Sequence, residues 1–456
     1  MYMNDVKYLA PSDLEEIPVF TNWDPPIEQT VYNDFKINML EGNIEHVGCT
    51  KGTSSFAKLL SIVSRDEIAS ILELVKKKNA EFKTDPDSVD GMCTHEIYVD
   101  MNNSEGELEK KITEIIDSRI TPYVRYRYPQ KNDRLCTPSQ CLIRRYRDDE
   151  RKVHLTHRDG HAYATVVISL SDYGTDYKGG IYVASAERYK KIVPLHKGDA
   201  VVHKHDLLHG VKVYDNGGER WSWIIWFKDS IRNVDHNIEW YKEKAHAGIP
   251  VYQSLYANAL NDKDRIFWLN KAAEQGHTNS MVKLARAHMK TLGSDYVQYD
   301  LEKAYKLYRK AIETSQEPDA QYEIVQLILM KPTTFEFLSE VIDLLQKSAQ
   351  GGHLYAMFNL GIAHLYGYTG KQNTKLAAEW FEASQIPEGL IAASMFYDSI
   401  QDNNYANKLR LRASKLGYGT PWRKRARICT GLGGASGVDI NLPWPTLPNG
   451  LKPDIW

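Results

Sequence analysis

The sequence predicts an α+β protein in which a double-stranded β-helix, or jelly-roll, with buttressing helices precedes an all-α domain of helical-hairpin repeats. Between residues 138 and 228, short segments rich in β-branched and aromatic residues are separated by turn residues, with no helical pattern between them. Beyond residue 235 this pattern disappears, and a helical motif recurs at intervals of 36 to 39 residues. A chain of 456 residues also exceeds what one hydrophobic core usually organises, so at least two domains are expected.

The N-terminal part of the chain divides into an arm and two helices. Residues 1–55 are rich in Asn, Pro and acids and show no sustained period, so we expect an arm on the surface of a jelly-roll domain at 56–235. A helix is predicted to begin at Ser64, because Ser64 and Glu67 have the spacing of a capping box before an amphipathic stretch. Apolar residues at helical spacing predict a second helix over 106–120. Both helices are expected to buttress a sheet.

The central segments alternate with period two, as strands do. The predicted strands are 139–146, 162–170, 179–185, 191–195, 199–204 and 220–227. Because these strands are short and no helices separate them, a jelly-roll or a barrel is the natural way to close the sheet.

The C-terminal repeat is visible in four aligned stretches. These are WLNKAAEQGH (268–277), LYRKAIETSQ (307–316), LLQKSAQGGH (344–353) and WFEASQIPEG (380–389), and a last copy is found at 409–419. The motifs KAAEQGH and QKSAQGGH resemble the Sel1-like repeats of the tetratricopeptide superfamily. We therefore predict a repeat domain at 236–425, which would offer a surface for a protein partner, and a C-terminal tail at 426–456.

Composition excludes several function classes. The chain is 42% hydrophobic and 25% charged, with a net charge of −2, so no global excess of positive charge indicates nucleic-acid binding. The basic stretches at 125–130 and 422–427 are interpreted as solvated faces. No segment has the length and apolar character of a membrane span or signal peptide, so a cytoplasmic protein is expected. The five scattered cysteines contain no C-x-x-C pair, which argues against a zinc finger.

The stretch HLTHRDGHA at 154–162 suggests a metal site. Two residues apart in an extended strand, His157 and Asp159 would present an imidazole and a carboxylate toward one ion. Non-haem Fe(II) takes two histidines and one carboxylate on one face and leaves three positions open. The candidates for the missing ligand are His196, His203, His205 and His209.

His209 fits this role best because of the residues on its C-terminal side. Arg220 comes eleven residues later, after a Gly-rich turn, at the start of an alternating strand. If that strand paired with the one that carries His209, Arg220 would enter the same barrel mouth and could bind a carboxylate with its planar fork. Ser222 and Trp226 would share that face. A cupin site built on His203 and His205 is the alternative, but it lacks the glutamate that cupins use.

The pattern H-x-D, then H, then R-x-S resembles the Fe(II)/2-oxoglutarate-dependent oxygenases of the prolyl 4-hydroxylase-like branch, over about residues 60–230. The resemblance implies His157, Asp159 and His209 as ligands of Fe(II), with no further catalytic residue. It implies 2-oxoglutarate and O2 as cosubstrates, supported by ascorbate. The distal carboxylate of 2-oxoglutarate would be bound by Arg220, Tyr146 and Ser222 or Thr165. Since halogenating relatives replace the carboxylate ligand, Asp159 argues against halogenation.

The substrate stays open at this point. Tyr163 and Ser169 stand where many prolyl hydroxylase-like relatives carry an arginine and a tyrosine, so a prolyl substrate is not assumed. The candidate substrate contacts are Arg144, Tyr163 and Trp226, and His154 and His161 are interpreted as rim residues. Both a peptidyl side chain and a small amino-acid-derived metabolite agree with the sequence, as do hydroxylation, desaturation and oxidative cyclisation. The alternative from another class is a non-catalytic scaffold that acts through its repeats.

Overall fold

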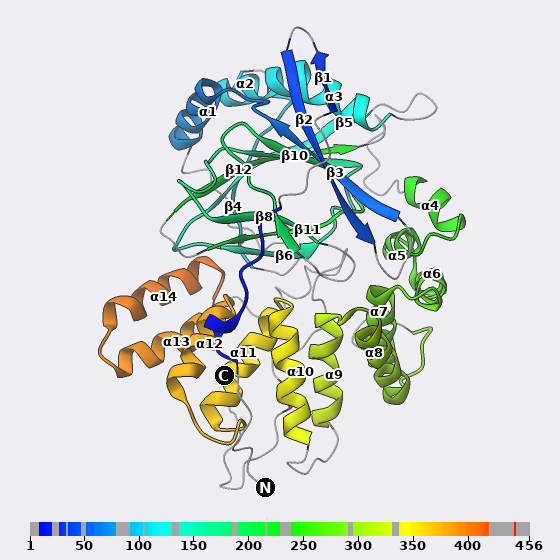
Figure 1. The fold of residues 1–456 in the computed structure, drawn as a ribbon, viewed down its shortest axis with the longest axis vertical. Coiled ribbons are helices and arrows are strands. Elements are labelled where there is room, and N and C mark those ends of the chain that lie inside the picture. Colours follow the sequence, from blue (N-terminus) through cyan, green and yellow to red (C-terminus); the bar gives the residue numbers. More distant parts are fainter. Residues whose placement is uncertain are drawn as a thin grey trace.

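A computed structural model describes residues 9–20, 27–32, 35–46, 52–78, 92–103, 105–129, 136–184, 190–214, 218–228, 239–290, 295–330, 337–418 and 442–443. For 27–32, 35–46, 52–55 and 239–240 the description is limited to the backbone. Figure 1 shows two parts, a strand-rich half and an arc of helices beneath it. The predicted order, antiparallel sheets and then helical repeats, is confirmed at this level.

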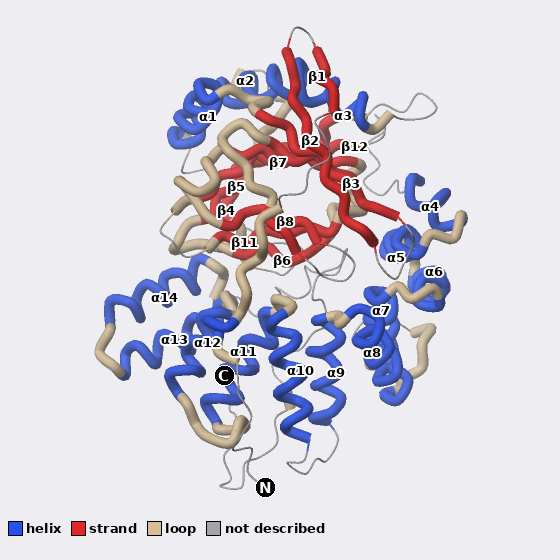
Figure 2. The backbone as a smooth tube through the Cα atoms, in the orientation of Figure 1, coloured by secondary structure: helices blue, strands red, loops and turns tan. Residues whose placement is uncertain are grey.

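The strand-rich half contains two antiparallel sheets. Over the described residues, the large sheet has the strand order β1 (Ile27–Tyr32), β2 (Phe35–His46), β3 (Gly52–Leu60), β10 (Ala200–Lys204), β7 (Ala164–Ser169), β12 (Arg220–Lys228), β5 (Thr137–Tyr146) and β4 (His95–Tyr98). The small sheet has the order β6 (Val153–His157), β11 (Leu208–Val213), β8 (Gly179–Ala184) and β9 (Lys190–Ile192). Figure 2 shows the small sheet between the large sheet and the helical arc.

The six predicted strands are present as β5, β7, β8, β9, β10 and β12. Six of the described strands lie outside the predicted ranges, namely β1, β2, β3, β4, β6 and β11. β6 and β11 carry histidines, a threonine and a glycine among their apolar residues, so their hydrophobic alternation is weak. β6 carries His157 and β11 carries His209, two of the three candidate metal ligands.

The N-terminal arm differs from the expectation. β1 and β2 extend the edge of the large sheet, so the sheet begins well before residue 56. These strands read IEQTVY and FKINMLEGNIEH, and their many polar residues conceal the strand pattern. The earlier segment 9–20 connects the two halves: Phe20 and Pro18 exchange backbone hydrogen bonds with Ile192, while Trp380 donates its indole N–H to the carbonyl of Leu9. A short 3-10 helix, η1 (Pro11–Asp13), lies within this segment.

Helices cover the outer face of the large sheet. α1 (Arg65–Lys77) begins with the predicted capping box, in which Ser64 and Glu67 bond reciprocally to each other's backbone N–H. The second predicted helix forms as α2 (Glu107–Ile115), which continues through a π-helical turn, η3 (Ile116–Ile120), into α3 (Thr121–Arg127). Their apolar faces share one buried cluster with the outer residues of β7, β10 and β12. This packing fixes the strands that carry the site.

A second cluster fills the space between the two sheets. It contains Tyr146 and Tyr177 together with valines and isoleucines of β8, β10 and β11. Along β12, Arg220, Ser222, Ile224 and Trp226 alternate onto this inner face.

The helical arc contains α4 (Glu239–His246), α5 (Pro250–Asn258), α6 (Asp262–Glu274), α7 (Thr278–His288), α8 (Leu301–Ser315), α9 (Pro318–Met330), α10 (Leu338–Gln350), α11 (Leu354–Tyr366), α12 (Thr374–Ala383), α13 (Pro387–Ser399) and α14 (Asn403–Lys415). The repeated motifs fall on α6, α8, α10, α12 and α14, as the 36-to-39-residue interval predicts. Close packing depends on small residues: a β-carbon on Gly361 would lie 2.5 Å from a ring carbon of Phe381. None of the helices that the structure describes is both long and apolar enough to cross a membrane.

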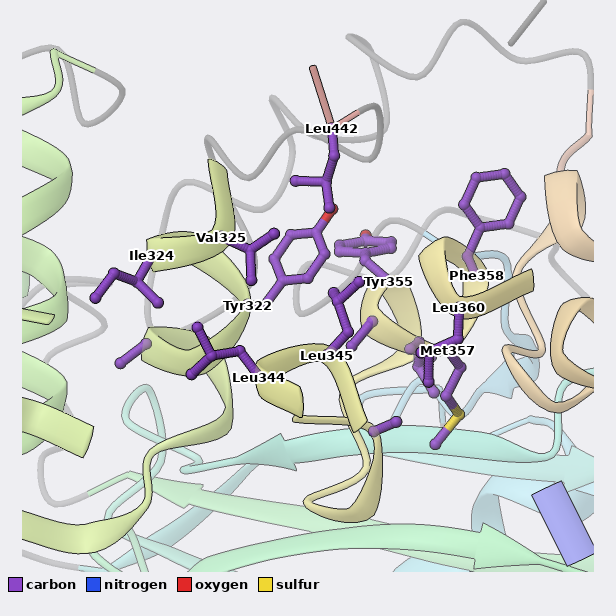
Figure 3. Close-up of a cluster of buried hydrophobic side chains, with 14 of the residues drawn as sticks. Tyr322, Ile324, Val325, Leu344, Leu345, Tyr355, Met357, Phe358, Leu360 and Leu442 are labelled. Carbon is purple, nitrogen blue, oxygen red and sulfur yellow. The ribbon is translucent and has the colours of Figure 1, made fainter. Parts of the chain in front are cut away.

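Figure 3 shows the core of the repeats, where Tyr322 and Tyr355 lie among leucines and valines of neighbouring helices. Leu442, from the predicted C-terminal tail, is buried in the same cluster. Leu442 of the tail therefore packs on the repeats.

Polar contacts join the two halves. Arg412 of α14 donates to the carbonyl of Glu150 at 3.1 Å, and Lys415 forms an ion pair with Asp149. At the other end of the arc, Tyr252 of α5 donates to Asp206 at 2.7 Å, and Tyr241 of α4 donates to the carbonyl of Gly160. The arc is thus held against the strand-rich half at both ends.

Candidate metal centre

His157, Asp159 and His209 come together at one end of the small sheet. His157 ends β6 and is the register partner of His209 in β11. The ligand atoms of the three residues all lie within 4.8 Å of one another, and Nε2 of His157 and of His209 lie 3.4 and 3.8 Å from the Asp159 carboxylate. Asp159 lies beyond the end of β6, so the cluster does not depend on the continuous strand assumed from the H-x-D spacing.

Backbone carbonyls orient both imidazoles. Nδ1 of His157 lies 2.7 Å from the carbonyl of Leu155, and Nδ1 of His209 lies 3.3 Å from that of Leu207. A carbonyl oxygen only accepts, so each Nδ1 carries a proton, which leaves each Nε2 as the ring atom that could bind a metal. This is the arrangement that metal-binding histidines usually have.

Asp159 is buried and held in place by two donors. Its Oδ2 accepts a hydrogen bond from Thr165 at 2.6 Å and another from the Trp226 indole at 3.2 Å. Burial alone would raise the pKa of Asp159, but the neighbouring His209 and His157 outweigh it and keep that pKa well below its ordinary value. Burial, assisted by the nearby His203, keeps the pKa of His209 well below its ordinary value. An ionised carboxylate and a neutral imidazole are the forms that bind metals.

These contacts change the interpretation of two residues. Thr165 was expected to bind 2-oxoglutarate and Trp226 to contact substrate, but the structure places both side chains on the Asp159 carboxylate. Both polar groups therefore orient Asp159.

Arg220 lies in the large sheet, not in a strand beside His209. β12 pairs with β5 and β7, whereas β11 pairs with β6 and β8, so the expected pairing of these two strands is wrong. Arg220 reaches across the space between the sheets instead: a β-carbon on Gly180 of β8 would lie 3.5 Å from its Nε.

The guanidinium of Arg220 is buried without a matching anion. Arg220 is 1% exposed, and its Nη1 donates to Ser222 at 3.3 Å. Its Nε and Nη2 make no hydrogen bond, and no carboxylate lies within ion-pair distance among the described residues. The rings of Tyr146 and Tyr177 lie 5.3 and 5.8 Å from its Cζ. A buried cation with free donors is costly unless an anion binds there.

Three of the four predicted cosubstrate residues, Arg220, Tyr146 and Ser222, thus lie together, and Thr165 lies apart from them with Asp159. Arg144 points inward as its strand parity indicates, but its Nε donates to the buried Glu96 at 2.8 Å. Tyr163 packs in the cluster on the outer face of the large sheet. The structure therefore does not bring Arg144 or Tyr163 to the metal-ligand cluster as free contacts.

His203, a candidate ligand that ranked behind His209 in the sequence, also lies beside this cluster. His203 is fully buried on the inner face of β10, with its Nε2 4.0 Å from Asp159 and its ring 4.4 Å from that of His209. Its Nδ1 lies 2.8 Å from the carbonyl of Lys204, and its Nε2 has no hydrogen-bond partner within the described part of the chain. The available signal was the alternation of Val201 and His203 in β10, which places both on one face.

Comparisons with known proteins found one family model and several similar solved structures. The Sel1 repeat family model matches residues 266–277, 278–313 and 354–384. One similar solved structure is a prolyl-4-hydroxylase from Pseudomonas putida, with 16% identity and a TM-score of 0.30, covering 38% of this chain and 91% of that one. Another is a 2OG-Fe(II) oxygenase family oxidoreductase from Burkholderia pseudomallei, with 19% identity and a TM-score of 0.30, covering 38% of this chain and 84% of that one. A Sel1 repeat protein from Oxalobacter formigenes is also similar, with 22% identity and a TM-score of 0.38, covering 44% of this chain and 61% of that one. No curated protein matches the sequence. The predicted repeats are confirmed: this chain contains Sel1 repeats in its C-terminal half.

Proposed function

We propose that the strand-rich half is the jelly-roll of an oxygenase that depends on Fe(II) and 2-oxoglutarate. The observation that carries this proposal is the buried, unmatched guanidinium of Arg220, on the same inner face of β12 as Trp226, which contacts Asp159. A cluster of two histidines and one carboxylate, together with a buried receptor for a carboxylate, is what such an enzyme needs.

The side chains present fit both groups. His157, Asp159 and His209 would hold the iron and leave three positions free, while Arg220 would bind the distal carboxylate of 2-oxoglutarate. When bound, Fe(II), 2-oxoglutarate and O2 would supply the oxidation of an unactivated C–H bond, with succinate and CO2 as co-products.

The chain's own residues would position these groups. Thr165 and Trp226 fix the orientation of Asp159, and the Leu155 and Leu207 carbonyls fix the imidazoles. Tyr146 and Tyr177 pack beside the Arg220 guanidinium and exclude water, which strengthens its attraction for a carboxylate.

A non-catalytic scaffold explains less. Such a protein has no use for a buried, unpaired guanidinium, whose desolvation opposes folding. The Sel1 repeats provide a surface for a protein partner, which we propose as an additional role for the parts of the arc that do not face the sheets.

The test is succinate formation from 2-oxoglutarate with Fe(II), O2 and ascorbate. We expect slow uncoupled turnover in the wild type and none in His157→Ala, because one ligand is lost. His196→Ala is the matched control and should keep wild-type turnover. The side chain of His196 is exposed, and its charged neighbour is Asp172, which is not a candidate ligand. Equal succinate formation by wild type and His157→Ala would contradict the proposal.

A further inference from the structure

A cavity of about 500 Å³ lies between the small sheet and the helical arc. Its sheet side includes His157, Tyr182 and Leu208, and its other side is formed by α5, α7 and the later repeats. Residues of the N-terminal segment, from Pro11 to Ile17, close part of its rim. His157 is the one member of the metal-ligand cluster in this lining, so the cavity adjoins the candidate centre.

Charged side chains of both signs line the cavity, and one of them, Lys190, donates to the carbonyl of Gly351 at 2.9 Å. Lys152 is paired with Asp148, and Asp319 lies 3.8 Å from Arg286 and from His353. Glu317 accepts a hydrogen bond from Thr278. The remaining charged lining residues are Glu15, Glu16, Arg158, Lys212 and Lys283.

Lys283, on α7, is a buried cation whose hydrogen-bond acceptor is an uncharged amide oxygen. It is 8% exposed, and its Nζ donates to the amide oxygen of Asn258 at 2.7 Å, which carries no charge. No carboxylate lies within ion-pair distance of its Nζ among the described residues. Burial, and after it the charges of Arg286, Arg158 and Arg265, lowers the pKa of Lys283 to about 7. An anion beside Lys283 would stabilise its charged form against both the burial and the repulsion from the neighbouring arginines.

Arg158 provides a second cation from the opposite wall. It lies between His157 and Asp159 in sequence, lines the cavity, and donates through Nε to the carbonyl of Asp206 at 3.1 Å. The apolar lining is supplied mainly by Leu155, Leu208, Val251, Leu255, Leu354 and Met357. The cavity thus combines apolar walls with a cationic corner near the metal-ligand cluster.

We propose that this cavity binds the substrate, a small organic acid with an apolar portion, whose anionic group is held by Lys283 and Arg158 while its reacting carbon lies near His157. This inference rests on the proposed function. Lys283 belongs to the Sel1 repeat matched at 278–313, so the repeats would form part of the substrate site. A cavity of this volume is in the range of sites that bind small molecules.

A pair of probes that differ in charge tests this proposal. We would titrate the full chain with the anionic 8-anilino-1-naphthalenesulfonate and with the neutral N-phenyl-1-naphthylamine, and monitor their fluorescence. Mn(II) and 2-oxoglutarate would be present without oxygen, so that the anion site at Arg220 is filled. Lys283→Met should lower the affinity for the anionic probe by about tenfold or more and change the affinity for the neutral probe by less than about twofold.

Two further variants make the result decisive. Lys283→Gln keeps a polar group near Asn258 and should also lose affinity for the anionic probe, and it serves if Lys283→Met folds poorly. Lys271→Met removes an exposed lysine of α6 and should change neither affinity. An unchanged anionic affinity in Lys283→Met, or equal weakening of both probes, would overturn the inference. Absorbance of the Fe(II) and 2-oxoglutarate complex, measured separately, shows whether the proposed function fails on its own.

Discussion

Replacing Arg220 by methionine should weaken 2-oxoglutarate binding without destabilising the ligand-free protein. Removing one partner of a buried charge pair costs about 2–5 kcal/mol, and 1.4 kcal/mol is tenfold in affinity, so Kd should rise by about 30-fold to 4000-fold. Because the Nε and Nη2 groups of Arg220 are buried and unpaired, an apolar side chain of similar length should leave Tm unchanged or raise it.

The assay is calorimetric titration of 2-oxoglutarate into the Mn(II)-loaded protein, together with thermal unfolding without ligand. Arg144→Met is the matched control, because Arg144 is also buried in this sheet but is paired with Glu96. In Arg144→Met the free energy of unfolding should fall by about 3–5 kcal/mol, whereas the affinity for 2-oxoglutarate should stay within a few-fold of the wild type. An Arg220→Met protein with lowered Tm and unchanged Kd would refute the reasoning, since Arg220 would then be a structural residue.

Three other predictions rest on single contacts or on one buried group. Thr165→Val removes the donor to Asp159 and should lower Mn(II) affinity by about 10- to 100-fold, measured by calorimetry; an unchanged affinity would show that Thr165 does not orient the ligand. Gly361→Ala forces Phe381 to move and should lower the free energy of unfolding by about 1–3 kcal/mol in denaturant titrations, whereas an unaltered midpoint would contradict the close packing. Burial lowers the pKa of His364 to about 4, so the unfolded chain takes up its proton first and stability is lost as pH falls from about 6.5 toward 4. His364→Gln should flatten this dependence, and an identical slope would disprove it.

The sequence predicted the strands whose composition reflects their burial. β7 and β12 are rich in valine, isoleucine and tryptophan because they are covered on both faces. β6 and β11 were not among the predicted strands because histidines, a threonine and a glycine weaken their apolar alternation. β1 and β2 were not predicted because their many polar residues conceal the strand pattern.

The candidate site was predictable where spacing along the chain determines the chemistry. His157, Asp159 and His209 come together as expected, although their metal-binding role stays a prediction. The partner of Arg144 is Glu96 of β4, a strand distant in sequence, and the partner of Thr165 is Asp159 in the loop after β6; periodicity reveals neither contact. His203 was a candidate ligand in the sequence, but its position beside both Asp159 and His209 depends on the pairing of β10 with β7, which spacing along the chain does not reveal.

The repeats were predictable as helices but not as a wall of the cavity. Alanines and glycines at regular spacing indicate helix packing, whereas the docking of the arc depends on single contacts such as Arg412 with Glu150. The cavity and the position of Lys283 in it result from that docking, so no local pattern could have shown them.

The most direct test of the proposed function is the visible absorbance of the protein when Fe(II) and 2-oxoglutarate are added without oxygen. Bidentate 2-oxoglutarate on a protein-bound Fe(II) produces a charge-transfer band, so we predict this band in the wild type. We predict its absence in His157→Ala and its appearance in Arg220→Met only at much higher 2-oxoglutarate concentration. A wild-type protein that binds neither Fe(II) nor 2-oxoglutarate, and shows no band, would contradict the proposed function.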